Sequence, residues 1–153
     1  MSEQGPPDIP MARWPSVSAL PGAAQALDGL AGTRRFRLAI ATNASLSRKP
    51  DIWAALERVG LRNYFEEVFC FTELGFKKNQ VEFWQIVSRQ LRVPLPSIAM
   101  VGDSLEHDAS APRRFGVQAF WLAPLGSVPA QVTSVPAVHS LLEFAAWARS
   151  QSS

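Results

Sequence analysis

Hydrophobic and polar positions along the chain fall into two patterns, short apolar runs and longer stretches with helical periodicity. The apolar runs predict buried strands, because near-continuous hydrophobicity over a few residues suits a strand of a parallel sheet that is covered on both faces. Residues 1–15 precede these patterns, contain four prolines and predict a flexible lead-in, which leaves 16–150 as one core domain. The predicted strands are FRLAIAT (36–42), EVFCF (67–71), SIAMVG (97–102) and VQAFWL (117–122).

Around these runs, apolar residues recur at the three- and four-residue spacing of amphipathic helices. Strands that alternate with helices favour a parallel sheet with helices on both faces, a three-layer α/β/α Rossmann-like fold. The region 124–136 is rich in Pro, Gly and Ser and is expected to be a loop. The predicted helices cover 23–31, a segment from a cap at Ser45 or Ser47 to Gly60, 80–91, a segment from Asp103 to about Phe115, and 138–150.

Composition narrows the class of protein. Of the 153 residues, 47% are hydrophobic, which is enough for a core, and the net charge of +2 comes from scattered basic residues rather than from a nucleic-acid-binding stripe. No apolar run approaches the roughly 20 residues of a membrane span. The single cysteine, Cys70, excludes an intrachain disulfide and fits a reducing compartment. These features predict a cytoplasmic protein with no nucleic-acid or membrane partner.

In parallel sheets, ligands bind beyond the carboxyl ends of the strands. The segment AMVGDSLEHD places Asp103 at such an end and Asp108 five residues later. Two carboxylates near one strand end suit Mg²⁺, which prefers few carboxylates together with water and phosphate oxygens. The alternative is that Asp103 caps the next helix and Asp108 is a solvated acid. The other strand ends of interest are Thr42-Asn43, Phe71-Thr72-Glu73 and Leu122-Ala123.

Two further groups are candidates for phosphate binding. Thr42 and Asn43 offer a hydroxyl and an amide at the end of the first predicted strand, and Lys77 or Lys78 offers a point charge in the segment ELGFKKN. Taken singly, Thr42 and Asn43 are more often turn or cap residues, and either lysine is more often a solvated loop residue.

The order of these motifs (a strand then Thr, a loop Lys, a strand then GDSxxxD) resembles the haloacid dehalogenase-like (HAD) hydrolase superfamily. The resemblance implies that Thr42 binds the transferred phosphoryl group and that Asp103 binds Mg²⁺. Asp108 then completes the acidic site or orients the lysine. Lys78 best matches the motif lysine, although Asn79 stands where the family commonly has proline and Lys77 is a substitute. The implied activity is hydrolysis of a small phosphorylated metabolite.

One family motif is not found in these residues. Members begin with a strand that ends in Asp-x-Asp, which supplies the nucleophile and the general acid/base, and many insert a helical cap after it; the 153 residues contain no Asp-x-Asp. Asp8 has Pro10 where the second Asp would stand and is interpreted as linker. We therefore expect a truncated or fragmentary enzyme core that is inactive alone, or a non-catalytic phosphate- or Mg²⁺-binding or interaction module. A phospho-acceptor receiver domain fits less well, because its paired acids after the first strand are not seen.

The nucleophile strand normally lies between the strand ending at Thr42 and the strand ending before Asp103. Without it, unpaired backbone groups would be costly if buried. We expect one of three outcomes: the two flanking strands pair directly, the lead-in fills the slot, or another chain does, as a strand-completing partner or in a homo-oligomer.

Overall fold

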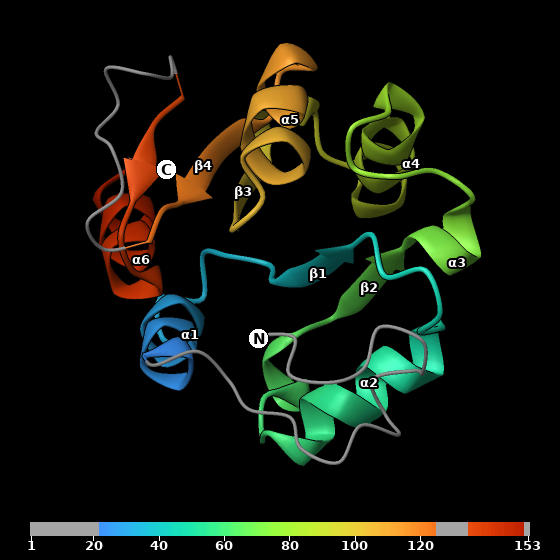
Figure 1. The fold of residues 1–153 in the computed structure, drawn as a ribbon. Coiled ribbons are helices and arrows are strands. Elements are labelled where there is room, and N and C mark those ends of the chain that lie inside the picture. The colour runs from blue at the N-terminus through green and yellow to red at the C-terminus, as the bar shows by residue number, and fades with distance from the viewer. Residues whose placement is uncertain (1–21, 125–134, 152–153) are drawn as a thin grey trace. The chain divides into compact units, whose positions relative to one another are not determined.

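The computed structural model describes residues 22–124 and 135–151. These residues form two compact units, described separately below. Unit 1 takes in the described residues up to Gly75 together with 148–151, and unit 2 takes in those from Phe76 to Trp147. In both units parallel strands are connected through helices, which confirms the predicted mixed α/β class (Figure 1).

Unit 1 is built on two parallel strands, β1 (Ala39–Thr42) and β2 (Glu67–Cys70). Their register places Thr42 directly beside Cys70 at the carboxyl edge. Helix α2 packs against β2 (Figure 1), and both bury apolar side chains, such as Ile52 and Leu56 from the helix and Phe69 from the strand. The remaining elements are α1 (Ala23–Ala31), α2 (Lys49–Arg58), a 3₁₀ turn at Arg62–Tyr64 and the short helix α3 (Phe71–Leu74).

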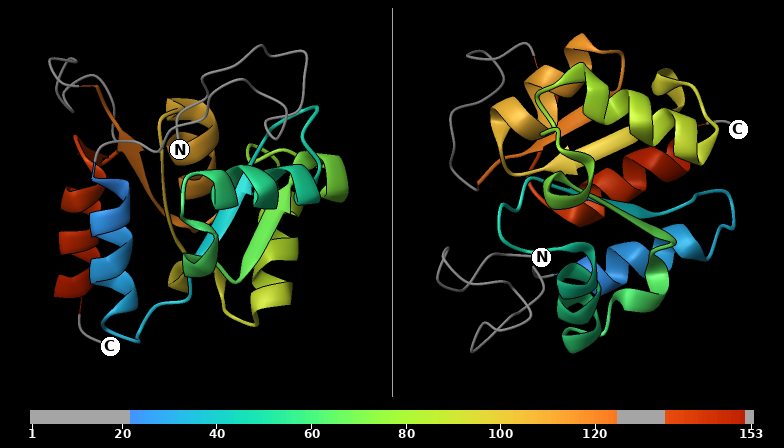
Figure 2. Two further views of the ribbon diagram at one scale, coloured as in Figure 1. Left: turned by 90° about the horizontal axis from the view of Figure 1, so that it is seen from below. Right: turned by 90° about the vertical axis from the view of Figure 1, so that its right-hand side faces the viewer.

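Unit 2 contains a three-stranded parallel sheet in the order β3-β4-β5. The segment η4–α5 packs against β3 and β4 (Figure 2), and Phe120 of β4 contacts the α6 rings Phe144 and Trp147 at centroid distances of 5.5 and 4.5 Å. The elements are α4 (Val81–Leu91), a 3₁₀ turn at Leu95–Ser97, β3 (Ala99–Gly102), the π-helix η4 (Leu105–Ser110), α5 (Ala111–Arg114), β4 (Gln118–Leu122), β5 (Ala137–Val138) and α6 (Leu141–Ser150), whose last turn belongs to unit 1.

The strands differ from the prediction in pairing and burial. The described strands form two sheets, β1-β2 in unit 1 and β3-β4-β5 in unit 2, rather than the one predicted sheet. All four residues of β1 are only half-buried and Ala99 of β3 is exposed, although both runs were predicted to be buried on both faces. Strand β2 also has a single hydrogen-bonded neighbour in the described part of the chain but is buried, because helices α2 and α3 pack against it.

The helix boundaries also need correction. Neither Ser45 nor Ser47 caps α2; Arg48 is the N-cap residue, and its N–H donates to Oδ2 of Asp51 at 2.9 Å. The helix predicted after Asp103 is a π-helix followed by one turn of α-helix, and α3 and β5 were not predicted.

Two predicted segments cannot be compared with the structure. The lead-in 1–15 and most of the predicted loop, residues 125–134, lie outside the described residues. Within the described residues, no helix has the length and hydropathy to cross a membrane.

Candidate functional site

Asp103 stands directly after β3, at its carboxyl end, and is exposed. Its main chain is held in place because the indole Nε1–H of Trp121, on the neighbouring strand β4, donates to the Asp103 carbonyl at 3.1 Å. The backbone at this position is therefore fixed from inside the sheet, while the carboxylate stays open to a ligand.

Asp108 lies on the π-helix η4 and is buried, with 2% of its surface exposed. One carboxylate oxygen, Oδ1, accepts from the ammonium of Lys78, and the other, Oδ2, accepts from the Ser104 N–H at 3.0 Å. The wide π-helical turn, which was not predicted, brings this carboxylate back to Gly102 at the end of β3.

Gly102 is the place where Asp108 meets the strand. A Cβ built on Gly102 would overlap the carboxylate and Cβ of Asp108, so only glycine leaves room for the carboxylate. The motif glycine is thus explained by a close approach between backbone and side chain, not by an unusual backbone angle.

Lys78 is buried, with 8% of its surface exposed, although it is a lysine in a segment between helices. Its main chain is anchored by Trp84, whose Nε1–H donates to the Lys78 carbonyl at 2.8 Å. Lys77 is exposed. Of the two lysines that the sequence left open, Lys78 is therefore the one that the structure brings to Asp108, 30 residues away along the chain.

Thr42 and Asn43 belong to unit 1, whereas Lys78, Asp103 and Asp108 belong to unit 2. Thr42 ends β1, and its Oγ1 accepts the Ala44 N–H at 3.1 Å, which shapes the loop after the strand and leaves the hydroxyl proton to be donated. Asn43 is the next residue and is half-buried.

The carboxylates of unit 2 suit the kind of Mg²⁺ site in which one or two carboxylates hold the ion together with water and phosphate oxygens. No group of three or more His, Cys, Asp or Glu side chains that could hold a metal occurs in the part of the chain that the structure describes. Mg²⁺ does not require one, because it is commonly held by one or two carboxylates plus water and phosphate oxygens. Asp103 can supply such a carboxylate, whereas both oxygens of Asp108 are already engaged.

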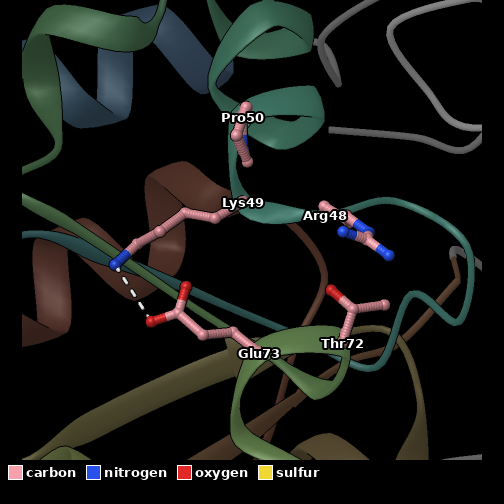
Figure 3. A pocket seen from close by; sticks show the side chains of 5 residues that line it. All are labelled: Arg48, Lys49, Pro50, Thr72 and Glu73. Atoms are coloured by element: carbon pink, nitrogen blue, oxygen red, sulfur yellow. Dashed lines mark hydrogen bonds and ion pairs between the residues drawn. The ribbon is translucent and has the colours of Figure 1, made fainter.

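A cavity that sequence reasoning missed lies in unit 1. Its volume is about 330 Å³, and it is lined by Arg48, Lys49, Pro50, Thr72 and Glu73 (Figure 3). Thr72 and Glu73 follow β2 and were among the strand-end residues of interest; nothing in the sequence pointed to Arg48 or Lys49.

The charges at this cavity are coupled. The Lys49 ammonium lies 2.6 Å from Glu67 and 3.5 Å from Glu73. Burial alone would lower the pKa of Lys49, but the hydrogen bond and charge of Glu67, aided by Glu73, outweigh it and leave that pKa raised. Burial likewise works to raise the pKa of Glu67, but the bond and charge of Lys49 and the Val68 N–H leave it lowered.

Parallel strands joined by helices, with polar residues at their carboxyl ends, define an α/β protein of the parallel-sheet class. The haloacid dehalogenase-like hydrolase family matches residues 8–116, which is more than half of the chain. The chain therefore belongs to the haloacid dehalogenase-like hydrolases. Asp8 is the first matched residue.

A curated relative narrows the comparison. The 5-amino-6-(5-phospho-D-ribitylamino)uracil phosphatase YigB of Escherichia coli strain K12 is 35% identical over 68 residues, which are 44% of this chain and 29% of the relative. The chain thus aligns with less than a third of that phosphatase.

Solved structures show the same fold. An uncharacterized protein from Listeria monocytogenes serotype 4b matches with a TM-score of 0.76 at 22% identity, over 92% of this chain and 84% of the other. A HAD phosphatase from Thermococcus onnurineus matches with a TM-score of 0.72 at 22% identity, over 85% of this chain and 58% of the other. YfnB from Bacillus subtilis, solved with bound magnesium, matches with a TM-score of 0.69 at 23% identity, over 82% and 54% of the two chains.

Proposed function

We propose that the chain is the core of a Mg²⁺-dependent phosphomonoester hydrolase that acts on a small phosphorylated metabolite. The observation that carries the proposal is the buried Lys78–Asp108 pair at the carboxyl end of β3. Buried ion pairs contribute little net stability compared with apolar side chains of similar size. A lysine held in this position, next to an open carboxylate at Asp103, is better explained by binding of a phosphate than by folding.

Each residue has a distinct role in the proposal. The Thr42 hydroxyl and the Asn43 amide hold phosphoryl oxygens, and Lys78 adds a positive charge. Asp108 is a positioning residue that holds the Lys78 ammonium, which is the second of the two roles that the sequence left open. Asp103 would hold Mg²⁺, which when bound would supply positive charge to phosphate oxygens.

The proposed mechanism also needs a nucleophile, for which each aspartate of the chain is a candidate. In complete members of the family, an aspartate of the Asp-x-Asp motif is phosphorylated. Four of the five aspartates of this chain lie in the described residues, and three of these have structural partners: Asp28 accepts from Tyr64, Asp51 caps α2 and Asp108 holds Lys78. The fourth, Asp103, is assigned to the metal. We accordingly expect little turnover from this polypeptide alone.

The absence of Asp-x-Asp from the 153 residues favours a second candidate, a non-catalytic module that binds phosphate and Mg²⁺. The two candidates differ in turnover and agree in binding. Under either candidate a strand-completing second chain or a homo-oligomer is a proposed partner, which sedimentation of the purified chain would detect.

The deciding experiment measures hydrolysis of p-nitrophenyl phosphate with Mg²⁺ and with EDTA, beside equilibrium binding of inorganic phosphate and Mg²⁺. Asp103→Asn should abolish metal-dependent turnover, whereas Glu106→Gln, at an exposed acid three residues away, should not. Asp8→Asn is included because Asp8 is the aspartate outside the described residues. Turnover would support the hydrolase. Binding without turnover would leave either the non-catalytic module or an enzyme core that needs a further strand, and a folded chain with neither binding nor turnover would refute both candidates.

A further inference from the structure

We propose that the cavity lined by Arg48, Lys49, Pro50, Thr72 and Glu73 is a second anion-binding site, which takes an oxyanion group, carboxylate or phosphate, carried by the part of the substrate that hydrolysis releases. The assignment to a substrate rests on the proposed function; binding of an anion at Arg48 does not depend on it. The site would make the chain selective for phosphate esters of acids.

The cavity lies on the functional edge of unit 1. Thr42 and Cys70 are register partners at the carboxyl ends of β1 and β2. Arg48 follows Thr42 through the loop into α2, and Thr72 stands two residues beyond Cys70. Ligands of parallel sheets bind at this edge. A molecule whose phosphoryl group is held by Thr42 would therefore have its remaining atoms on the same edge as the cavity.

Charge selects an anion. Figure 3 shows the Lys49–Glu73 ion pair on one side of the cavity and Arg48 with Thr72 on the other. The Lys49 charge is already balanced by Glu67 and Glu73, whereas none of the ion pairs found in the described residues involves Arg48. The guanidinium of Arg48 is consequently the cation left for a ligand. Its planar fork of donors matches a carboxylate or a phosphate through two parallel hydrogen bonds.

The wall that carries Arg48 is fixed before any ligand arrives. The Thr72 hydroxyl donates to the carbonyl of Ser47 at 2.9 Å, and Ser47 is buried. On the other side, the N–H of Arg48 is held by Asp51 at 2.9 Å. Because the backbone is already held, less conformational entropy is lost when a ligand binds. The volume of about 330 Å³ is at the small end of ligand sites, which suits one acidic arm of a metabolite rather than a whole nucleotide.

The first test needs no turnover and no metal. Malonate and, separately, inorganic phosphate are titrated into the isotope-labelled full chain, and NMR follows the Arg48 Nε–Hε and the Thr72 and Glu73 amides. Saturable shifts at these groups are expected with the wild type. Arg48→Gln should weaken malonate binding at least about tenfold. The matched control is Arg58→Gln, at the opposite end of α2 and outside the cavity lining, and it should bind as the wild type does.

The titrations distinguish a carboxylate ligand from a phosphate ligand, and they also show whether the site exists. A lower dissociation constant for malonate than for phosphate would identify a carboxylate as the ligand, and the reverse would identify a phosphate. An absence of saturable shifts at Arg48, or equal binding by Arg48→Gln and Arg58→Gln, would overturn the site. Amide spectra of both variants establish that they are folded.

The second test connects the site to a substrate. Phospholactate and isopropyl phosphate differ only by a carboxylate in place of a methyl group. Arg48→Gln should lower kcat/KM for phospholactate about tenfold through KM and leave isopropyl phosphate unchanged. Malonate binding at Arg48 without any hydrolysis would keep the anion site and make the chain a binding module or an incomplete enzyme, whereas hydrolysis that is indifferent to Arg48 would reject the substrate role of the site and keep the hydrolase.

Discussion

Replacing Lys78 with methionine leaves the Asp108 carboxylate buried without its counter-charge. Asp108 is 2% exposed and Lys78 is 8% exposed, so water cannot replace the lost ammonium. Removing one partner of a buried pair costs about 3–5 kcal/mol. Because the Ser104 N–H still donates to Oδ2 of Asp108, we expect the lower end of that range, about 3 kcal/mol.

The assay is urea unfolding followed by far-UV circular dichroism on four proteins: the wild type, Lys78→Met, Asp108→Asn and the double variant. Asparagine can still accept the Ser104 N–H, so the double variant removes both charges and keeps that hydrogen bond. Its loss of stability should fall short of the sum of the single losses by about 2 kcal/mol, as is usual for groups in direct contact.

Lys77→Met is the matched control, because Lys77 is adjacent in sequence but exposed. It should change the free energy of unfolding by no more than about 0.5 kcal/mol. If Lys78→Met costs as little as Lys77→Met, or if the losses in the double variant simply add, the buried pair does not exist in solution. The argument for a phosphate-binding lysine would then lose its main support.

Two further predictions concern one unit each. Gly102→Ala should displace the Asp108 carboxylate and lower both stability and Mg²⁺-dependent turnover, measured by urea unfolding and by hydrolysis; an unchanged unfolding midpoint would contradict the close approach. The Lys49–Glu67 pair should stabilise unit 1 between pH values of about 4.5 and 10.5. Because the pKa of Glu67 is lowered in the folded protein, its contribution to stability is fully present above pH 4.5 and is lost as the pH falls through the folded pKa. Because the pKa of Lys49 is raised, its contribution to stability is fully present below pH 10.5 and is lost as the pH rises through the folded pKa. Lys49→Met should flatten the pH profile of unfolding at both ends, and a profile that keeps its shape would refute the pairing.

Much of the fold was predictable because it depends on local pattern. The helix at Ala23–Ala31 was predicted residue for residue, and Cys70 is a fully buried core residue as expected of an apolar strand. The elements that were not predicted depend on distant parts of the chain. β5 has only two residues and exists because β4 pairs with it, and no pattern of hydrophobic residues can specify a pairing of that length.

The candidate site divides in the same way. Sequence order alone singled out Thr42, Asp103 and Asp108, since each follows or closely succeeds an apolar run. The family resemblance favoured Lys78 over Lys77, but the sequence could not exclude Lys77. Both are lysines in one short segment, and what separates them is burial against an aspartate 30 residues away.

The apolar runs at 36–42 and 97–102 show what hydrophobicity does and does not determine. Both form strands, yet β1 is half-buried throughout and β3 begins with an exposed residue. An apolar run indicates that a segment is stable when its faces are covered, but the run does not specify which elements cover them. Within the described residues β2, like β1, has a single hydrogen-bonded neighbour, yet β2 buries Val68, Phe69 and Cys70. The difference lies in the helices: α2 and α3 pack against β2. The burial of a strand therefore depends on helices that are distant or separate in the sequence, and the hydrophobicity of the strand itself cannot specify them.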